Sequence, residues 1–294
     1  FQDEGRLGQA GQGVSAAGAM DRAAMRAANR LVGNPSDAAC IEIAYGGFQW
    51  RCRGEVVVAV TGAAGPIERV TAAGRLASVT RYEAVGLSDG DRLTLGEPTA
   101  GIRSYLAVRG GFAVTPVLGS CSTDTLAQVG PPPISGGDVL WVRPLSRGVV
   151  GAAETCPDTL PTTREPVMLD VVLGPRTDWF TPEAIERFTS QNWSVTPQSN
   201  RVGLRLEGAV PLARAVRTEL PSEATALGAI QVPPSGQPVL FLADHPLTGG
   251  YPVIGAVATH HLDRAGQIPI GAQVRFNPIR PFRRLSIPEP RVRP

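Results

Sequence analysis

Two arginines with a glycine between them stand in the segment RVGLRL, residues 201–206, where polar and apolar residues alternate. On a strand, Arg201, Gly203 and Arg205 would lie on one face, because successive side chains point to opposite faces. Two guanidinium groups with room between them can hold a carboxylate or a phosphate through paired hydrogen bonds. The same alternation also fits an amphipathic strand whose arginines face solvent.

A second chemically suggestive segment is ADHPLTGGYP, residues 243–252, which follows an apolar run. Asp244 and His245 could act as a general acid/base pair, since an imidazole titrates near neutral pH. Consecutive glycines allow a sharp turn that presents backbone N–H groups to an anion. The anion-binding candidates of this turn are Thr248, Gly249, Gly250 and Tyr251. A hairpin turn with a surface histidine is the simpler alternative.

Residues 119–124, GSCSTD, offer hydroxyl groups and a thiol. Cys121 could be a nucleophile, but no histidine lies near it in sequence, so we favour hydrogen bonding by Ser120 and Ser122. His260 and His261 resemble a metal-binding pair. On a strand, however, neighbouring side chains point apart, so we expect no shared metal.

Further acidic and basic residues stand at the start of the chain. Asp3 and Arg6 lie in a glycine-rich loop, and Asp21 directly precedes a helical pattern. We expect these three side chains to line the same cleft, with Asp21 as a third catalytic candidate. No HExxH metal helix is present. The sequence therefore indicates an incomplete active site, to be finished by a partner protein.

Composition limits the function classes. The 294 residues carry a net charge of +2, which is too small to favour a nucleic-acid partner. No apolar run approaches the ~18 residues of a membrane-spanning helix, so we expect a cytoplasmic protein with reduced thiols. All 28 basic residues are arginines, which excludes a Schiff-base lysine, a P-loop lysine and a biotinyl-lysine. The chain starts without Met, and we expect further N-terminal residues in the complete protein.

The elements that must position these residues are mostly short strands. One helix is expected from about Met20 to Leu31, and a second with Thr181 as N-cap and Pro182 in its first turn. Glycine- and proline-rich turns separate the strands, which favours barrels or sandwiches. The expected strands are Cys40–Ile43, Phe48–Arg51, Val56–Thr61, Arg92–Leu95, Tyr105–Val108, Val139–Val142, Val167–Leu173, Gly203–Glu207, Val239–Leu242, Val253–Thr259 and Gln273–Asn277.

The domain organisation follows from these strands. We expect an N-terminal β-barrel half with one helix over residues 1–147 and a linker over residues 148–165, which is poor in periodicity. A C-terminal β-barrel half over residues 166–287 and an extended tail over residues 288–294 follow. The fold class is mainly β.

Eight motifs in order along nearly the whole chain resemble the allophanate hydrolase subunit 2 family, also called the KipA-type family. They are QDEGRLG at 2–8, GAMD at 18–21, NRLVGN at 29–34, YLAVRGG at 105–111, LGSCSTD at 118–124, SNRVGLRLEG at 199–208, GAIQVP at 228–233 and TGGYP at 248–252. Where the family usually has an arginine in its Gly-Ser-Arg-Ser-Thr motif, this chain has Cys121. Either Arg109 or Arg103 replaces that arginine, or the position binds no ligand.

The resemblance implies a cyclophilin-like β-barrel architecture and a working partner. Members of the family resemble the C-type component of bacterial 5-oxoprolinase, an enzyme that uses ATP to open 5-oxo-L-proline to L-glutamate. The implied partners are a KipI-type protein and a LamB/YcsF-type protein, which are the other two components of that enzyme. ATP, accompanied by Mg²⁺, is expected to lie largely in a cleft shared with the KipI-type partner. The substrate is a small-molecule amide.

Three functions therefore stay open. The first is the role of a 5-oxoprolinase component. The second is the carboxyltransferase component of a urea carboxylase, with biotin supplied by another chain. The third is a non-catalytic protein that antagonises a kinase inhibitor.

Overall fold

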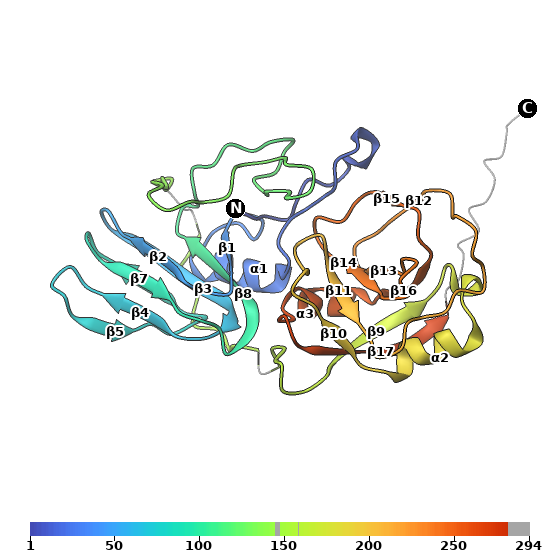
Figure 1. Ribbon diagram of the computed structural model, residues 1–294. Coiled ribbons are helices and arrows are strands. Elements are labelled where there is room, and N and C mark those ends of the chain that lie inside the picture. Colours follow the sequence, from blue (N-terminus) through green and yellow to red (C-terminus); the bar gives the residue numbers. More distant parts are fainter. Residues whose placement is uncertain (145–147, 158, 282–294) are drawn as a thin grey trace, which may run out of the picture.

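The computed structural model describes residues 1–144, 148–157 and 159–281, so the predicted tail 288–294 lies outside the described residues. Strands β1 to β8 belong to the first half of the chain and β9 to β17 to the second (Figure 1). The mainly-β fold class is confirmed. No helix in the described part of the chain is both long and apolar enough to cross a membrane.

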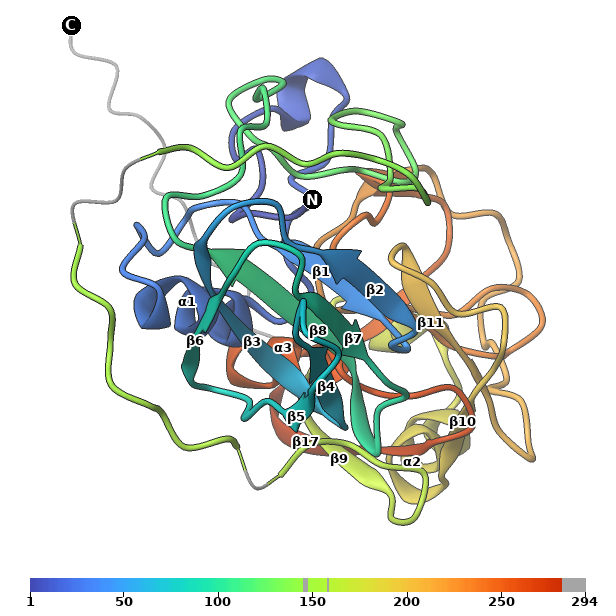
Figure 2. The same ribbon diagram turned by 90° about the vertical axis from the view of Figure 1, so that its left-hand side faces the viewer.

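The first half contains two four-stranded antiparallel sheets. One has the order β1–β8–β3–β6 and the other β2–β7–β4–β5 (Figure 2). The strands of the first sheet are β1 (Ile41–Ala44), β8 (Ala100–Val108), β3 (Val56–Ala64) and β6 (Ala84–Leu87). Those of the second are β2 (Phe48–Arg51), β7 (Arg92–Leu95), β4 (Ile67–Val70) and β5 (Leu76–Ser78). We expected a barrel here, but these two sheets have free edges and pack face to face.

Alternation on β8 shows how the first sheet is covered on both sides. Leu106 and Val108 pack in the apolar cluster shared with the second sheet. Tyr105 and Ala107 instead pack against α1 (Arg22–Leu31). The first half is thus a stack of helix, sheet and sheet. A short 3₁₀ helix, η1 (Ala10–Gln12), lies in the N-terminal loop.

Helix α1 begins at Arg22, slightly later than the predicted start near Met20, and ends at Leu31 as predicted. The Asp21 carboxylate caps it by accepting a hydrogen bond from Ala24 N at 2.8 Å. Its apolar face buries Met25, Ala28 and Leu31. Gly33, with a φ of 71°, follows the end of the helix in the left-handed region that glycine tolerates.

The second half is a closed seven-stranded barrel with the order β10–β11–β14–β13–β16–β9–β17. These strands are β9 (Val167–Leu173), β10 (Trp193–Val195), β11 (Gly203–Glu207), β13 (Ala229–Gln231), β14 (Val239–Phe241), β16 (Val253–Val257) and β17 (Gln273–Pro281). The β9–β17 pair is parallel, and the other barrel pairs are antiparallel. A small ladder joins β12 (Glu223–Ala224) to β15 (Thr248–Gly249).

The barrel core is filled by aromatic and aliphatic side chains. Phe188 of α2 (Pro182–Ser190) stacks on Phe276 with ring centres 4.5 Å apart and lies beside Trp193. Thr181 caps α2 as predicted, accepting from Ala184 N. The remaining helices are short: η2 (Thr177–Trp179), η3 (Thr259–His261) and α3 (Leu262–Gly266).

Two expectations about strands need correction. The predicted strand Val139–Val142 is absent: only an isolated bridge pairs Val142 with Phe112. The described residues between β8 and β9 otherwise form loops, including those of the predicted linker. The strand expected to reach Thr259 ends at Val257, and a 3₁₀ helix follows.

Candidate functional site

The predicted residues of the N-terminal loop and of residues 119–124 meet around the Asp3 carboxylate. Ser120 and Ser122 each donate a hydroxyl hydrogen bond to it at 2.6 Å, and the backbone N–H groups of Gly5 and Cys121 donate at 2.8 and 2.6 Å. Burial alone would raise the pKa of Asp3, but these hydrogen bonds hold it below its ordinary value. Four donors use the acceptor capacity of one carboxylate, so Asp3 ties two loops together.

Arg6 lies in the same loop cluster and is only 2% exposed. Its Nη2 donates to the Ser122 carbonyl oxygen, and its Nε lies 3.5 Å from Val117 O. Nη1 is buried and has no partner among the described residues. Arg6 is thus the one member of this predicted set with an unused buried donor in the part of the chain that the structure describes.

Arg201 and Asp244 are brought together, but as an ion pair. Nε and Nη2 of Arg201 donate to the two Asp244 oxygens, both at 2.9 Å. Thr125 donates to the same carboxylate through its N–H at 2.9 Å and its hydroxyl at 2.7 Å. Arg201 also contacts Glu42 through Nη1 and donates to Gly18 O at 2.7 Å. Its guanidinium therefore has its donors engaged within the protein.

Glu42, on β1, is the acid around which the two halves meet. Its Oε2 accepts from Met20 N at 3.0 Å and from the Tyr105 hydroxyl at 2.8 Å. Its Oε1 lies 3.7 Å from Arg103 Nε and pairs with Arg201. Burial would raise the pKa of Glu42, yet the Arg201 and Arg103 guanidinium groups lower it. Two acids and two arginines balance one another here.

Gln267 completes these contacts from the second half. Its Oε1 accepts the backbone N–H groups of Ile102 and Arg103 at 3.0 and 2.9 Å. Its Nε2 donates to Asp21 Oδ2 at 2.7 Å and to Arg103 O at 2.9 Å. Arg103 in turn donates to Gly266 O. We call the set Asp21, Glu42, Arg103, Tyr105, Arg201, Asp244 and Gln267 the seam network, because it joins the two halves.

Asp21 makes the seam network sensitive to pH in a defined direction. Burial, opposed by the hydrogen bonds from Gln267 and Ala24, raises the pKa of Asp21 to about 6 from 3.8. Because the folded state then binds the proton more tightly, its protonation adds stability as pH falls below about 6. That contribution is lost as pH rises through the folded pKa.

A serine substitution tests this expectation. Asp21→Ser keeps an oxygen that can cap α1 but removes the titrating group. We expect the difference in unfolding free energy between wild type and variant to change by about 1–3 kcal/mol between about pH 4.5 and about pH 7. Urea unfolding at both pH values measures it. An identical difference at the two pH values would show that the Asp21 carboxyl does not titrate in this range.

Arg205 lies apart from the seam network. Strand β11 begins only at Gly203, so Arg201 lies before it. Arg205 is an exposed residue of β11, opposite Val239 of β14. Its side chain forms no ion pair within the described residues. The predicted arginine pair is therefore divided: the Arg201 side chain is only 14% exposed and lies at the seam, while Arg205 follows the solvent-facing alternative.

His245 is held by partners other than Asp244. Its Nδ1 lies 2.9 Å from Pro246 O and 3.3 Å from Thr225 Oγ1. A carbonyl oxygen only accepts, so the proton is assigned to Nδ1 and Nε2 is left as the basic nitrogen. The ring stacks on Phe241 with centres 6.1 Å apart. No hydrogen bond joins His245 to Asp244 among the described residues, so the two do not form the expected pair.

The four residues of the Thr248–Tyr251 turn do not all lie at one site. Thr248 and Gly249 form β15 and pair with β12. A Cβ on Gly249 would come within 2.4 Å of Gln231 Nε2, which donates to Tyr251 O. Gly250 and Tyr251 line a groove with a volume of about 810 Å³, within the usual range for small-molecule sites.

Two arginines on the segment before β12 make this groove basic. Arg214 lies with its guanidinium carbon 5.9 Å from the centre of the Tyr251 ring and donates to Val232 O. Arg217 is exposed at the same groove. Neither pairs with a carboxylate in the part of the chain that the structure describes. The geometry thus leaves two cations available to an anionic ligand.

A second cavity at the seam is a weaker candidate. It has a volume of about 210 Å³ and contains Arg22 and Arg26. Arg26 already makes two hydrogen bonds to Glu4, at 2.6 and 2.8 Å, and Arg22 lies 4.0 Å from the same carboxylate. The positive charge of this cavity is therefore offset within the protein, and we take the larger groove as the candidate ligand site.

Several residues of these sites escaped the sequence reasoning. For Glu42 the sequence pattern was misleading, because an acid between two isoleucines of a strand is typical of a solvent-facing side chain. Arg214 and Arg217 stand in a segment without periodicity, so the sequence pattern indicated no role for them. Arg103 and Arg109, considered as substitutes for a family arginine, are used elsewhere. Arg103 belongs to the seam network, and Arg109 donates to Val32 O and Gly148 O.

Comparison with known proteins agrees with this architecture. Residues 12–278 match the carboxyltransferase domain family, subdomains A and B. The chain belongs to this family, which corresponds to the predicted allophanate hydrolase subunit 2 resemblance. Among its relatives is the C-type component of Escherichia coli 5-oxoprolinase, 35% identical over 280 residues, with 94% of this chain and 86% of the relative covered.

Other relatives are much longer proteins. Urea amidolyase of Saccharomyces cerevisiae is 34% identical over 295 residues, covering 94% of this chain but 16% of the relative. The crystal structure of Kluyveromyces lactis urea carboxylase superposes with a TM-score of 0.83 at 32% identity, covering 94% of this chain and 26% of that one. This chain therefore corresponds to one part of those enzymes.

Proposed function

We propose that this chain is one component of an ATP-dependent 5-oxoprolinase that opens 5-oxo-L-proline to L-glutamate. The observation that carries the proposal is its 35% identity to the C-type component of the Escherichia coli enzyme over 94% of the chain. The chain acts in the cytoplasm with a KipI-type protein and a LamB/YcsF-type protein. Asp21, Arg201 and Asp244 then serve mainly to hold the halves together, since the seam network uses their polar atoms.

The groove is where this chain would hold the substrate. Arg214 and Arg217 bind its carboxylate, because a guanidinium fork matches the two oxygens of that group. Gly250 and Tyr251 form part of the groove lining next to these arginines. His245, the predicted proton-transfer residue, is not among the residues that line the groove and contacts Thr225 and Pro246 instead.

In this proposal ATP binds mainly to the KipI-type partner. A lactam resists water, and ATP supplies the phosphoryl group that activates its oxygen. This chain has no lysine, and one acid, Glu219, lines the groove. That donor set suits an anion but not Mg²⁺, which prefers several oxygen ligands. The groove arginines hold the carboxylate while the partner holds nucleotide and metal.

The second candidate is carboxyl transfer to urea or a similar amide. It is favoured by the similarity to urea amidolyase and urea carboxylase. The same two arginines would then face a carboxylated group brought on biotin by another chain, because this one has no lysine to carry it.

Reconstitution distinguishes the candidates. The chain is mixed with its KipI-type and LamB/YcsF-type partners, 5-oxoproline and Mg-ATP, and glutamate and ADP are measured. Glutamate that forms only with all three proteins supports the proposal. Its absence, while gel filtration shows an assembled complex, rejects the 5-oxoprolinase role. Carboxylation of urea with an added biotin carboxylase would then favour the second candidate. Binding of the partner proteins without any turnover would favour the non-catalytic antagonist of a kinase inhibitor.

A further inference from the structure

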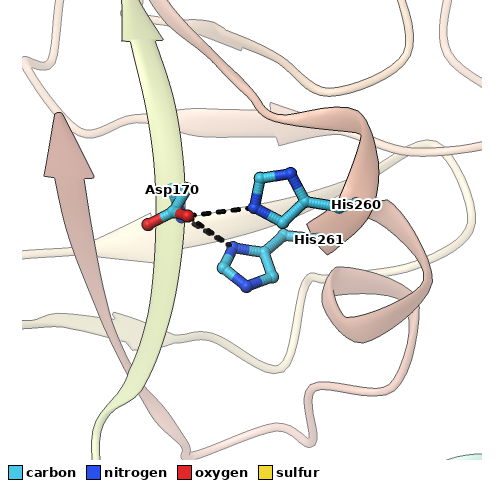
Figure 3. A group of neighbouring side chains, drawn as sticks. All are labelled: Asp170, His260 and His261. Atoms are coloured by element: carbon cyan, nitrogen blue, oxygen red, sulfur yellow. Dashed lines mark hydrogen bonds and ion pairs between the residues drawn. The ribbon is translucent and has the colours of Figure 1, made fainter. Parts of the chain in front are cut away.

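Three potential metal ligands meet on the outside of the barrel, away from the residues assigned above. Asp170 lies on β9, and His260 and His261 lie in η3 (Figure 3). His260 Nε2 is 2.9 Å from Asp170 Oδ2, and His261 Nδ1 is 3.9 Å from the same oxygen. One ligand atom from each residue lies within 4.8 Å of the others. Within the described residues, this is the one such group of three.

Local backbone conformation explains why two neighbouring histidines face the same carboxylate. On a strand they would point to opposite faces, which was the reason to expect no shared metal. In a 3₁₀ helix successive side chains are only about 120° apart. The two imidazole centres are accordingly 4.4 Å apart, and both rings turn toward Asp170 (Figure 3).

A hydrogen bond to its other oxygen orients the Asp170 carboxylate. Asn277, on the parallel strand β17, donates its side-chain N–H to Asp170 Oδ1 at 2.7 Å. Oδ2 is thereby directed to the imidazoles, which is how outer hydrogen bonds orient metal ligands. His260 is 59% exposed, so water can complete the coordination of an ion on that side.

His261 is prepared as a neutral ligand. Its Nδ1 accepts a hydrogen bond from Asp170 N at 2.8 Å, so this nitrogen carries a lone pair and no proton. An ion bound here takes the place of that hydrogen bond at Nδ1. Metal bonds of about 2.0–2.2 Å need ligand atoms roughly 3–3.6 Å apart, so the 3.9 Å between His261 Nδ1 and Asp170 Oδ2 must shorten when the ion binds.

We propose that Asp170, His260 and His261 form a binding site for one divalent transition-metal ion of the Zn²⁺ type. Two imidazoles and one carboxylate suit zinc, nickel or cobalt, whereas Mg²⁺ prefers oxygen ligands alone. The ion joins η3 to β9. Helix α3 follows η3 directly, and its Asp263 accepts a hydrogen bond from Arg22 N at 3.0 Å. Gln267, directly after α3, belongs to the seam network. The ion therefore stiffens the segment that contacts α1.

Zinc titration of the full, tag-free chain tests the site. After chelator treatment, calorimetry with ZnCl₂ is expected to show one ion per chain, and Zn²⁺ to raise the melting temperature. His260→Ala, at an exposed position, is expected to weaken binding at least about 10-fold and to abolish the shift, and Asn277→Ala to weaken it about 10–100-fold. With Co²⁺ as the probe, d–d absorption bands report imidazole coordination.

The chain's three histidines provide a matched control. His245→Gln removes the one histidine outside the cluster and is expected to leave zinc affinity unchanged. Equal affinity in wild type and His260→Ala would overturn the proposal, as would binding lost in His245→Gln alone. Failure of wild type to bind any Zn²⁺ in calorimetry would overturn it as well. None of these outcomes depends on the 5-oxoprolinase assay.

Discussion

Arg201→Ala is expected to lower the free energy of unfolding by about 3–5 kcal/mol, because it leaves two buried carboxylates without their main cation. Asp244 is fully buried and the Glu42 side chain is 7% exposed, so water cannot replace the lost guanidinium at either. Arg103 remains beside Glu42, but nothing described replaces Arg201 at Asp244 except Thr125. Urea unfolding of the isolated chain measures the loss.

Arg205→Ala is the matched control. It removes the same side chain four residues away, from an exposed position, and is expected to change stability by no more than about 0.5 kcal/mol. If the two variants lose similar stability, the seam network is not what joins the halves. If Arg201→Ala alone loses activity with stability intact, Arg201 is a ligand-binding residue after all.

Arg217→Ala is expected to reduce kcat/KM for 5-oxoproline about 10–100-fold in the reconstituted complex. The reason is that a hydrogen bond to a charged group contributes about 1.5–3 kcal/mol. Arg217 is exposed and forms no described ion pair, so folding should be preserved. Arg214→Ala is expected to act in the same direction, with an added loss of the contact to Tyr251. Glutamate formation over a range of substrate concentrations measures both.

The competing site is tested in the same assay. Arg205→Ala removes the exposed member of the pair recognised in the sequence and is expected to leave kcat/KM unchanged. A large loss with Arg205→Ala and none with Arg217→Ala would move the anion site from the groove to the outer face of β11. Losses that track complex assembly in gel filtration, rather than substrate concentration, would indicate a protein–protein interface instead.

Much of the fold was readable locally. The helix cap at Thr181 and the strand Val167–Leu173 depend on neighbouring residues, and the structure has both where expected. Short strands such as β13 and β15 were not predicted, because two or three residues carry no period and pair only through distant partners. The strand predicted at Val139–Val142 had the right residue types but found no ladder partner beyond one bridge.

The sequence by itself determined the family, the mainly-β class, the absence of lysine chemistry and the grouping of Ser120 and Ser122 as hydrogen-bonding residues. Those properties rest on residue identity and on short-range order. Only the tertiary structure decided that Arg201 pairs with Asp244 and Glu42, that Arg214 and Arg217 face the groove, and that His260 and His261 share a side. The first two depend on which distant segments of the chain pack together. The third depends on β16 ending at Val257, so that a 3₁₀ helix follows.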